Sequence, residues 1–257
     1  MEDFISPEYQ TLLKAHQLDS FESLWNLKLE AVDIPNTERG GWSSVCRLEL
    51  ELGDKTLAFY LKRQCNHQSL SWQRPLGEPT FSRELRNISA YAEAGIAALD
   101  AVFFAERRSS DGPQAILLTA ALDDYQALSE VLPHWKGYSV DQRARWCSSI
   151  GVAIARLHNA RLTHHCLYPK HVYLRLQDIE CSDPVRFIDL EKTRYQLLKW
   201  RDRVADVEAL LRRCNAWSDT EQQSFLESYL THLKPSKPLA QFQSLMGRRR
   251  ANKAARS

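Results

Sequence analysis

The stretch LHNARLTHHCLYPKHVYL, Leu157–Leu174, carries histidine and cysteine side chains between a predicted helix and a predicted strand. Ser139 and Gln142 have the spacing of a capping box and predict where the helix begins. Apolar residues recur at helical spacing and form its buried face, at Trp146, Ile150, Ala153 and Leu157. Residues 172–176 then read as a short strand, so the loop between them is the first place to look for chemistry.

This loop follows, position for position, the protein-kinase pattern L-H-x-x-x-x-x-H-R-D-L-x-P-x-N-V-x-L. His164 and Pro169 fall on the His and Pro of the pattern. His165 stands where Arg is usual, Cys166 where the catalytic Asp is usual, and His171 where the metal-binding Asn is usual. The framework of a catalytic loop is therefore present, and the departures concern its chemistry.

The first 120 residues read as a sheet with one substantial helix. Residues 6–32 are predicted to be helical, and Gly53-Asp54 is predicted to turn a hairpin between two apolar runs, 45–52 and 57–61. A helix is predicted to start after Pro79-Thr80 and to end at Gly95, and strands follow at 102–105 and 115–119.

From Ser139 the chain reads as mainly helical. Helices are predicted at 204–214 and, after a capping box of Thr220 with Gln223, at 221–233, and a strand at 185–190. This order predicts an α+β, protein-kinase-like two-lobed fold. Residues 1–120 would form a β-rich N-lobe with an N-terminal helical extension, and 121–257 a mainly α-helical C-lobe with a basic tail.

Residues typical of nucleotide binding lie in a loop before one predicted strand and at the end of the next. Gly40, Gly41 and Ser43 lie in a loop whose backbone N–H groups would approach phosphates, although a plain turn explains the glycines equally well. Lys62 ends a strand, and Glu84 follows in the next helix. A strand lysine paired with a helix carboxylate is the arrangement that positions ATP; the competing interpretation is two solvated surface charges.

Asp189 is the strongest candidate for a magnesium ligand, because it ends a short strand where such kinases place a metal-holding Asp. Glu191, two residues further on an extended chain, would point to the same face and add an oxygen ligand. Alternatively, both carboxylates pair with Lys192 and Arg194 at the surface. Asp206 is expected to anchor the catalytic loop from the following helix, or else to be an ordinary helix-surface acid.

Together the motifs resemble the lipopolysaccharide kinase superfamily, which includes the inner-core heptose and Kdo kinases, and most closely its InaA-like branch. The resemblance rests on motifs in a fixed order, RGGWSSV at 39–45, YLKR at 60–63, RPLGEPTFSRE at 74–84, HHCLYPKHVYL at 164–174 and FIDLEKTR at 187–194. It implies that Lys62 and Glu84 position ATP, that Asp189 holds Mg²⁺, and that the substrate is a sugar hydroxyl of the lipopolysaccharide core or its precursor.

The resemblance also bears on the substituted residues. The heptose kinases resemble this chain in carrying His at the position of His171. The InaA-like branch resembles it in carrying Cys at the position of Cys166. We hypothesise that His165 or Cys166, beside His164, replaces the missing base, since phosphoryl transfer depends mostly on positioning and charge neutralisation. The alternative is a pseudokinase that binds nucleotide and regulates.

The composition indicates the class of protein and the compartment in which we expect it. The chain has 257 residues, 44% hydrophobic and 26% charged, which is typical of a globular protein. Without a secretion signal or an apolar run of membrane-span length, we expect it in the cytoplasm, and its scattered cysteines to be reduced.

The chain ends in a basic tail, Arg248, Arg249, Arg250, Lys253 and Arg256. The tail is read as a frayed, solvated terminus or as a region attracted to an anionic membrane, which would place the protein on the inner face of the inner membrane. Since the tail lacks interleaved aromatic residues and the net charge is only +2, specific nucleic-acid binding is not expected.

Overall fold

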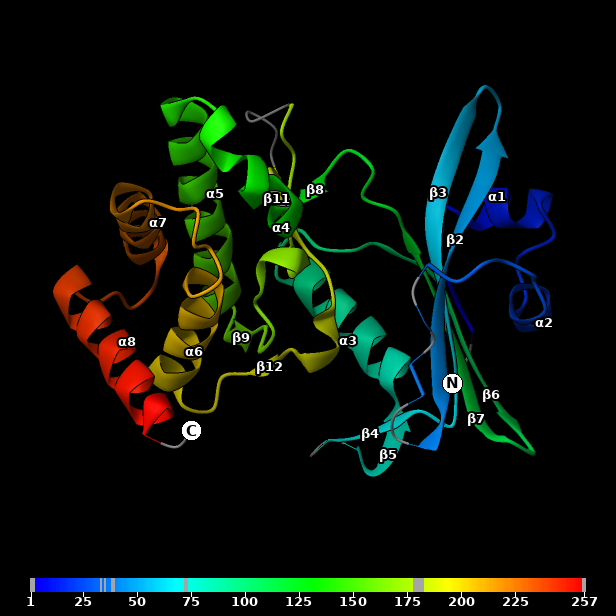
Figure 1. Ribbon diagram of the computed structural model, residues 1–257. Coiled ribbons are helices and arrows are strands. Elements are labelled where there is room, and N and C mark those ends of the chain that lie inside the picture. Colours follow the sequence, from blue (N-terminus) through cyan, green and yellow to red (C-terminus); the bar gives the residue numbers. More distant parts are fainter. Residues whose placement is uncertain are drawn as a thin grey trace. The chain divides into compact units, whose positions relative to one another are not determined.

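The computed structural model describes residues 3–32, 34, 36–37, 40–71, 74–177 and 183–255. Arg39, Cys181 and Arg256, which figure in the sequence predictions, lie outside the described residues. The chain divides into two compact units (Figure 1). The sheet unit comprises the chain up to Ser89 and Leu99–Asp123, and the helical unit comprises Ala90–Ala98 and the chain from Asp124.

The sheet unit contains a five-stranded antiparallel sheet in the order β1-β6-β7-β3-β2. The strands are β1 (Phe4–Ile5), β2 (Trp42–Leu52), β3 (Lys55–Cys65), β6 (Ala101–Ser109) and β7 (Gly112–Ala120). Leu52 pairs with Lys55 and Gly53 has φ +60°, which confirms the predicted hairpin at Gly53-Asp54. A separate ribbon of β4 (Gln68–Ser71) and β5 (Arg74–Pro79) follows β3.

The prediction of one helical extension over residues 6–32 is wrong. Two short helices, α1 (Gln10–Ala15) and α2 (Phe21–Trp25), form there instead. Gln17 has φ +56°, which ends the first helix, and Ser20 forms a capping box with Ser23 that starts the second. From Val32 the chain bonds to the edge of β2, for example from the Val32 N–H to the Val45 carbonyl.

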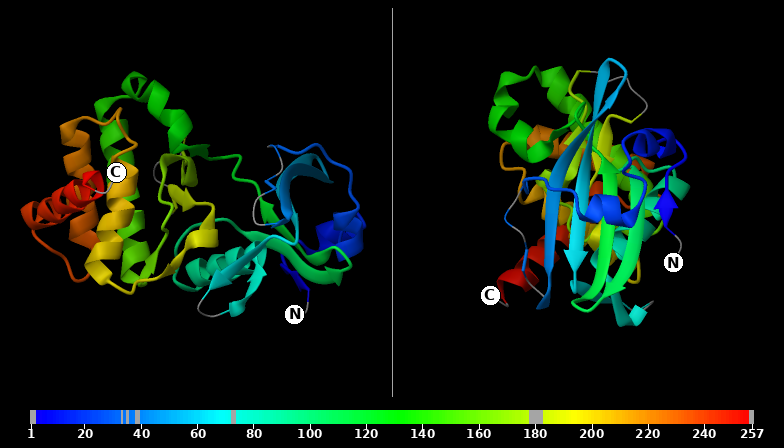
Figure 2. Two further views of the ribbon diagram at one scale, coloured as in Figure 1. Left: turned by 60° about the horizontal axis from the view of Figure 1, so that its bottom comes forward. Right: turned by 90° about the vertical axis from the view of Figure 1, so that its right-hand side faces the viewer.

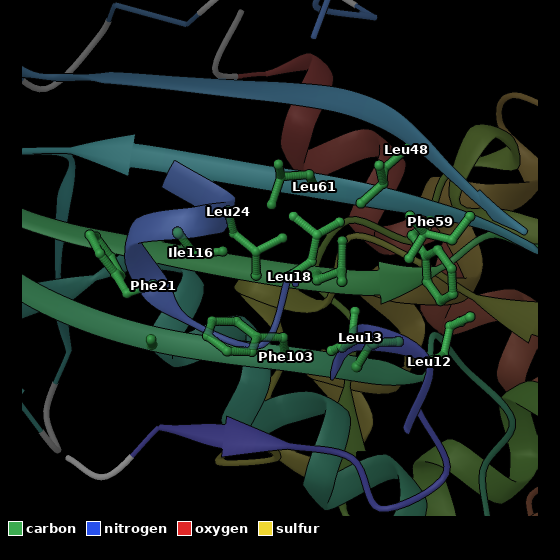
Figure 3. Close-up of a cluster of buried hydrophobic side chains, with 14 residues drawn as sticks. Leu12, Leu13, Leu18, Phe21, Leu24, Leu48, Phe59, Leu61, Phe103 and Ile116 are labelled. Carbon is green, nitrogen blue, oxygen red and sulfur yellow. The ribbon is translucent and has the colours of Figure 1, made fainter. Parts of the chain in front are cut away.

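Apolar residues of these two helices and of the segment between them form one core with the sheet (Figure 3). Leu12, Leu13, Leu18, Phe21 and Leu24 pack against one face of the strands. The residues that the sheet contributes to this core are Leu48, Leu50, Phe59, Leu61, Val102, Phe103, Ala105, Ile116 and Leu118. Each fully buried Leu or Phe contributes about 1.5–3 kcal/mol. The helices thus cover one face of the sheet, and the alternation of the strands turns Lys62 and Gln64 to the other.

Helix α3 (Thr80–Glu93) forms where it was predicted. It ends at Gly95, which has φ +65° and takes the left-handed conformation usual after a helix C-terminus. Residues up to Ser89 belong to the sheet unit, and the last turn belongs to the helical unit.

The helical unit is built from α4 (Leu128–Val131), α5 (Val140–Asn159), α6 (Lys199–Leu211), α7 (Asp219–His232) and α8 (Leu239–Ala254). The capping box of Ser139 with Gln142 is confirmed. The box before α7 is Ser218 with Glu221 rather than Thr220 with Gln223, because the extended residue that can cap is Ser218 and Thr220 is already helical.

Helices α5 and α7 pack side by side, and α8 packs on α6 and α7 (Figure 2, left). A Cβ on Gly151 would lie 2.6 Å from the Phe225 carbonyl oxygen, so the α5–α7 approach requires glycine at this position. The side chains of Phe242 and Met246, on one side of α8, are buried. The described part of the basic tail is therefore helical, which rules out the frayed terminus for those residues.

Short strands connect the helices of this unit. A three-stranded sheet has the order β11-β10-β8, with β8 (Gln126–Ala127), β10 (Val172–Leu174) and β11 (Val185–Phe187). The strand β9 (Leu162–Thr163) pairs with β12 (Arg194–Tyr195). These pairs hold both ends of the loop that contains Cys166.

The five cysteines that the structure describes are buried and free. Within the described residues, no helix has both the length and the apolar content needed to cross a bilayer.

Candidate functional site

Lys62 and Glu84 lie together in the sheet unit. Phe59 and Leu61 of β3 point into the core, so the alternation of the strand turns Lys62 to the opposite face. There Lys62 Nζ donates to Glu84 Oε1 at 2.6 Å, and the two side chains are 15% and 5% exposed. The pair anticipated from the sequence is thus a largely buried ion pair rather than two solvated charges.

Gln64 fixes the helix that carries Glu84. Its Oε1 accepts hydrogen bonds from the Thr80 hydroxyl at 2.6 Å and from the Phe81 N–H at 3.0 Å, at the start of α3. This side chain satisfies an N–H group that a helix start otherwise leaves unpaired. Sequence reasoning missed Gln64, although its position two residues after Lys62, on the same face of β3, was a usable signal.

The glycine loop is held against the end of β3. A Cβ on Gly41 would lie 2.2 Å from the Cys65 carbonyl oxygen, and the Asn66 amide donates to the Gly40 carbonyl at 2.9 Å. Ser43 exchanges backbone hydrogen bonds with Asn36. The close backbone approach by itself accounts for Gly41, and contact of this loop with phosphate stays a prediction.

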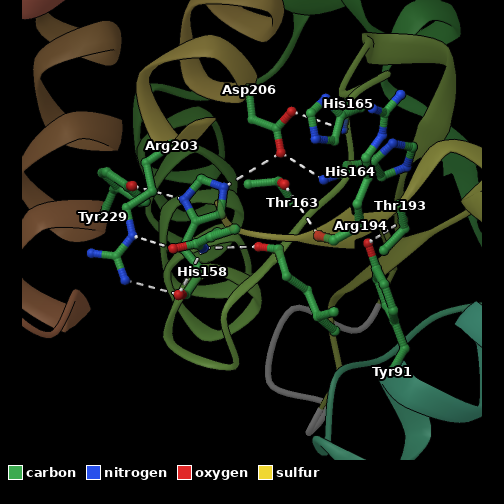
Figure 4. Close-up of polar contacts among 12 residues, drawn as sticks. Tyr91, His158, Thr163, His164, His165, Thr193, Arg194, Arg203, Asp206 and Tyr229 are labelled. Carbon is green, nitrogen blue, oxygen red and sulfur yellow. Dashed lines mark hydrogen bonds and ion pairs between the residues drawn. The ribbon is translucent and has the colours of Figure 1, made fainter. Parts of the chain in front are cut away.

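Asp206 of α6 holds the catalytic loop (Figure 4). One carboxylate oxygen accepts the His164 N–H at 2.7 Å and the other accepts the His165 N–H at 2.9 Å, while His158 Nε2 lies 3.4 Å away. Burial raises the pKa of the Asp206 carboxyl, but the hydrogen bonds and charges of His158 and His164 outweigh it, and the net shift is downward. Asp206 is thus a buried anchor, not a helix-surface acid.

His165 sits in a constrained part of the loop. Its φ is +61°, a left-handed conformation that is uncommon for a residue with a side chain. Burial lowers the pKa of the His165 imidazole below its ordinary value, although the Asp206 charge opposes the shift. The ring is therefore neutral at pH 7 and able to accept a proton.

His164 belongs to a column of rings inside the helical unit. The His164 ring meets Phe187 at 6.2 Å, and Phe187 meets Tyr91 at 6.3 Å, both edge to face. The His164 Nε2–H also donates a hydrogen bond to the Ile188 carbonyl oxygen, 3.0 Å away. His164 is completely buried, which makes it a framework residue and not a base in contact with substrate.

His171 and Asp189 face each other, with His171 Nε2 3.2 Å from Asp189 Oδ2. The other ring nitrogen, Nδ1, lies 2.7 Å from the Cys166 carbonyl oxygen, which can only accept, so Nδ1 carries the hydrogen. Burial lowers the pKa of the His171 imidazole and favours its neutral form, against the attraction of Asp189. In that form the Nε2 lone pair and the carboxylate oxygen, 3.2 Å apart, are both available to a cation placed beside the pair.

The expected geometry of Glu191 is wrong. Leu190–Lys192 forms a 3₁₀ turn rather than an extended strand, so Glu191 does not repeat the direction of Asp189. Among the residues that the structure describes, no three His, Cys, Asp or Glu side chains gather as a metal site. The donor atoms brought together are an Asp189 carboxylate oxygen and the His171 Nε2. The carboxylate is the ligand type that Mg²⁺ prefers, and Mg²⁺ usually takes few protein ligands and completes its shell with phosphates and water.

Cys166 occupies the position of the missing aspartate and is 6% exposed. Its carbonyl oxygen accepts from the Tyr168 N–H at 2.8 Å as well as from His171. The loop therefore keeps its shape through backbone bonds that do not depend on which side chain stands at this position.

A hollow of about 490 Å³ adjoins the same loop within the helical unit. Arg213 lies over the Tyr168 ring, 3.9 Å from its centroid. The lining residues are Ser129, Leu132, Pro133, Tyr168, Pro169, Lys170, Arg213, Asn215 and Ala216. Sequence reasoning missed this hollow, because Arg213 and Lys170 lie 43 residues apart and no pattern in the sequence links them.

The family model described as the lipopolysaccharide kinase (Kdo/WaaP) family matches residues 22–229. A solved structure, "WaaP in complex with acyl carrier protein", is similar at a TM-score of 0.67 and 19% identity, covering 97% of this chain and 98% of that chain. No curated protein sequence matches significantly. The structural similarity confirms the protein-kinase-like fold, with its β-rich and mainly α-helical parts.

Proposed function

The chain belongs to the lipopolysaccharide kinase (Kdo/WaaP) family, and on this premise we propose that it transfers the γ-phosphoryl group of ATP to a sugar hydroxyl of the lipopolysaccharide core, on inner-core heptose or Kdo. The observation that carries the proposal is the opposed pair of His171 Nε2 and Asp189 Oδ2, 3.2 Å apart, next to a catalytic loop anchored by Asp206.

The proposal gives a role to each of these side chains. Lys62, fixed by Glu84, would bind and orient the phosphates of ATP, and Asp189 with His171 would hold Mg²⁺. Bound Mg²⁺ neutralises charge on the phosphoryl oxygens during transfer. The histidine and the carboxylate lie close enough, 3.2 Å apart, for both to contact one cation.

In the transfer step the sugar oxygen forms a bond to the γ-phosphorus, and the bond from this phosphorus to the bridging oxygen of ADP breaks. ADP leaves with the electron pair of that bond, and the hydroxyl proton passes to a base. His165 is the better candidate, since it is neutral and retains exposed surface, whereas Cys166 is almost completely buried. Unchanged turnover in both His165→Ala and Cys166→Ala would exclude this role.

The hollow beside the loop supports an anionic sugar as substrate. Lys170 and Arg213 supply positive charge there, and Tyr168 offers an aromatic ring, which packs well against a sugar. Core sugars that bear a carboxylate or a phosphate match this lining better than neutral sugars do.

The test is to incubate the protein with γ-labelled ATP, Mg²⁺ and dephosphorylated lipopolysaccharide core, with Asp189→Asn as the inactive control. Label in the core that depends on Asp189 supports the kinase.

A second function, a nucleotide-binding pseudokinase, is favoured by one observation, cysteine in place of the aspartate at position 166. Tight Mg·ATP binding without transfer, and transfer restored by Cys166→Asp, would establish that alternative.

A further inference from the structure

The segment between β12 and α6 exposes large apolar side chains. Tyr195, Leu197 and Leu198 are 60%, 87% and 55% exposed. Three such residues within four positions form a contiguous patch, unlike the singly scattered apolar residues that any surface carries.

This patch is held in place by hydrogen bonds on both sides. Gln196 is buried, and its amide donates to the carbonyl oxygens of His158 and Leu162 at 2.9 and 3.0 Å. Asp202 of α6 accepts the N–H groups of Leu197 and Leu198, both at 2.9 Å. The backbone on which the leucines stand is therefore anchored, and their exposure is a built feature of the fold.

A hollow of about 660 Å³ opens beside Trp200, between α6 and α8. Its floor is apolar, from Trp200, Val204 and Leu245, and its rim is basic. The rim residues are Arg201, Arg248, Arg249 and Lys253, with Asn252.

The acidic groups of these helices offset only part of this charge, because the basic residues outnumber them. Glu208 is 4% exposed and lies under Arg212, Arg249 and Arg250, at 3.7–3.9 Å. Asp202 is engaged by the leucine backbone, and Lys237 adds a further cation 4.7 Å above the Trp200 ring. The surface is thus apolar at its centre and positive around it.

We propose that this surface, made of Tyr195–Arg201 and the basic half of α8, docks the protein on an anionic lipid bilayer. Leu197 and Leu198 enter the acyl boundary, and the rim of the hollow takes lipid phosphate groups. Exposed leucines and an aromatic residue flanked by basic side chains are the chemistry of an interfacial membrane site, and the positive rim favours lipid phosphate over a neutral protein partner. The inference does not rest on phosphoryl transfer.

The experiment is flotation of the purified chain with vesicles of phosphatidylcholine alone or with one third phosphatidylglycerol, at low and high salt and without ATP. Binding is expected on the anionic vesicles and should weaken with salt. Leu197→Ser with Leu198→Ser should weaken it about tenfold or more, since each buried methylene group adds to partitioning. Arg201→Gln with Arg248→Gln should weaken it about 25-fold at low salt.

Matched controls come from exposed residues elsewhere. Leu52→Ser with Val140→Ser removes comparably exposed apolar residues, and Arg108→Gln with Lys136→Gln removes two exposed cations. Both controls should bind as the parent chain does.

Several results would overturn the proposal. They are the absence of binding to any vesicle, equal binding to neutral and anionic vesicles, and a loss of binding in the controls as large as in the test variants. Self-association in light scattering that the leucine change abolishes, without vesicle binding, would assign the patch to a second copy of the chain. An inactive kinase assay leaves the vesicle result unaffected, so the two proposals fail separately.

Discussion

The Lys62 ammonium lies 2.6 Å from the Glu84 carboxylate, and neither side chain is more than 15% exposed. Replacing Lys62 by Met should lower kcat/KM for ATP about 10²-fold or more, because a preorganised charge aimed at phosphate is lost. Glu84→Gln should act in the same direction by releasing the lysine. The control is Lys55→Met, an exposed lysine on the same strand, and equal activity of the two lysine variants would contradict the assignment.

The opposed donors of His171 and Asp189 predict a metal site. Mn²⁺, used as a paramagnetic probe in the presence of ATP, should bind at least about tenfold more weakly to Asp189→Asn and to His171→Ala. Glu191→Gln should have a smaller effect, since the 3₁₀ turn takes Glu191 out of the extended geometry. Glu130→Gln, an exposed acid on α4, serves as the control, and metal affinity retained by both Asp189→Asn and His171→Ala would refute the site.

Asp206 should be among the most sensitive positions for stability. Asp206→Ala leaves the N–H groups of His164 and His165 without their acceptor and should lower the free energy of unfolding by about 3–5 kcal/mol. Asp219→Ala, an exposed acid in the first turn of α7, should cost less than about 1 kcal/mol. Urea unfolding measures both, and similar losses would show that Asp206 is not an anchor.

The free energy of unfolding should decrease below neutral pH, because the buried His158 side chain resists protonation in the folded chain. Its imidazole is buried among Tyr229, Asp206 and Arg203, with the Asp202 charge nearby, and burial lowers its pKa in the folded chain. In the unfolded chain the His158 imidazole binds a proton near pH 6.5. The free energy of unfolding is therefore unaffected by this group above about pH 6.5, and it decreases as the pH falls from there toward the lower pKa of the folded chain.

Urea titrations between pH 7.5 and 5.5 test this sign. His158→Gln should reduce the slope of unfolding free energy against pH by at most about 1.4 kcal/mol per unit. The exposed His134→Gln should leave the slope as it is. Stability that rises on acidification in the parent chain and not in His158→Gln would reverse the conclusion.

Gly41→Ala should destabilise the sheet unit by about 1–3 kcal/mol, because the added Cβ would lie 2.2 Å from a backbone oxygen of β3. Gly137→Ala is the matched control, since a Cβ there meets no atom within 4 Å. Thermal unfolding compares the two, and an unchanged midpoint in Gly41→Ala would show that the loop can move away from β3.

Local patterns predicted much of this protein. The hairpin at Gly53-Asp54, the start of α5 at Ser139 and the end of α3 at Gly95 depend on a few neighbouring residues, so the sequence contains their whole cause. Residues 6–32 were predicted to be helical from an irregular apolar face that includes Leu12, Leu18 and Phe21. A left-handed residue at Gln17 and the cap at Ser20 divide this segment, and these depend on how each part packs against the sheet.

For the site, the sequence by itself determined the residue types and their order, since Lys62, Glu84, His164 and Asp189 are spaced as the kinase pattern requires. Tertiary structure decided which of them meet. It joined Lys62 to Glu84, placed His171 beside Asp189, turned Glu191 away by a 3₁₀ turn, and gathered Trp200 and Arg201 of α6 with the basic side of α8 around one hollow. The physical reason is that hydrogen bonds and charges act over a few ångströms in space, between atoms whose separation along the chain does not fix their distance.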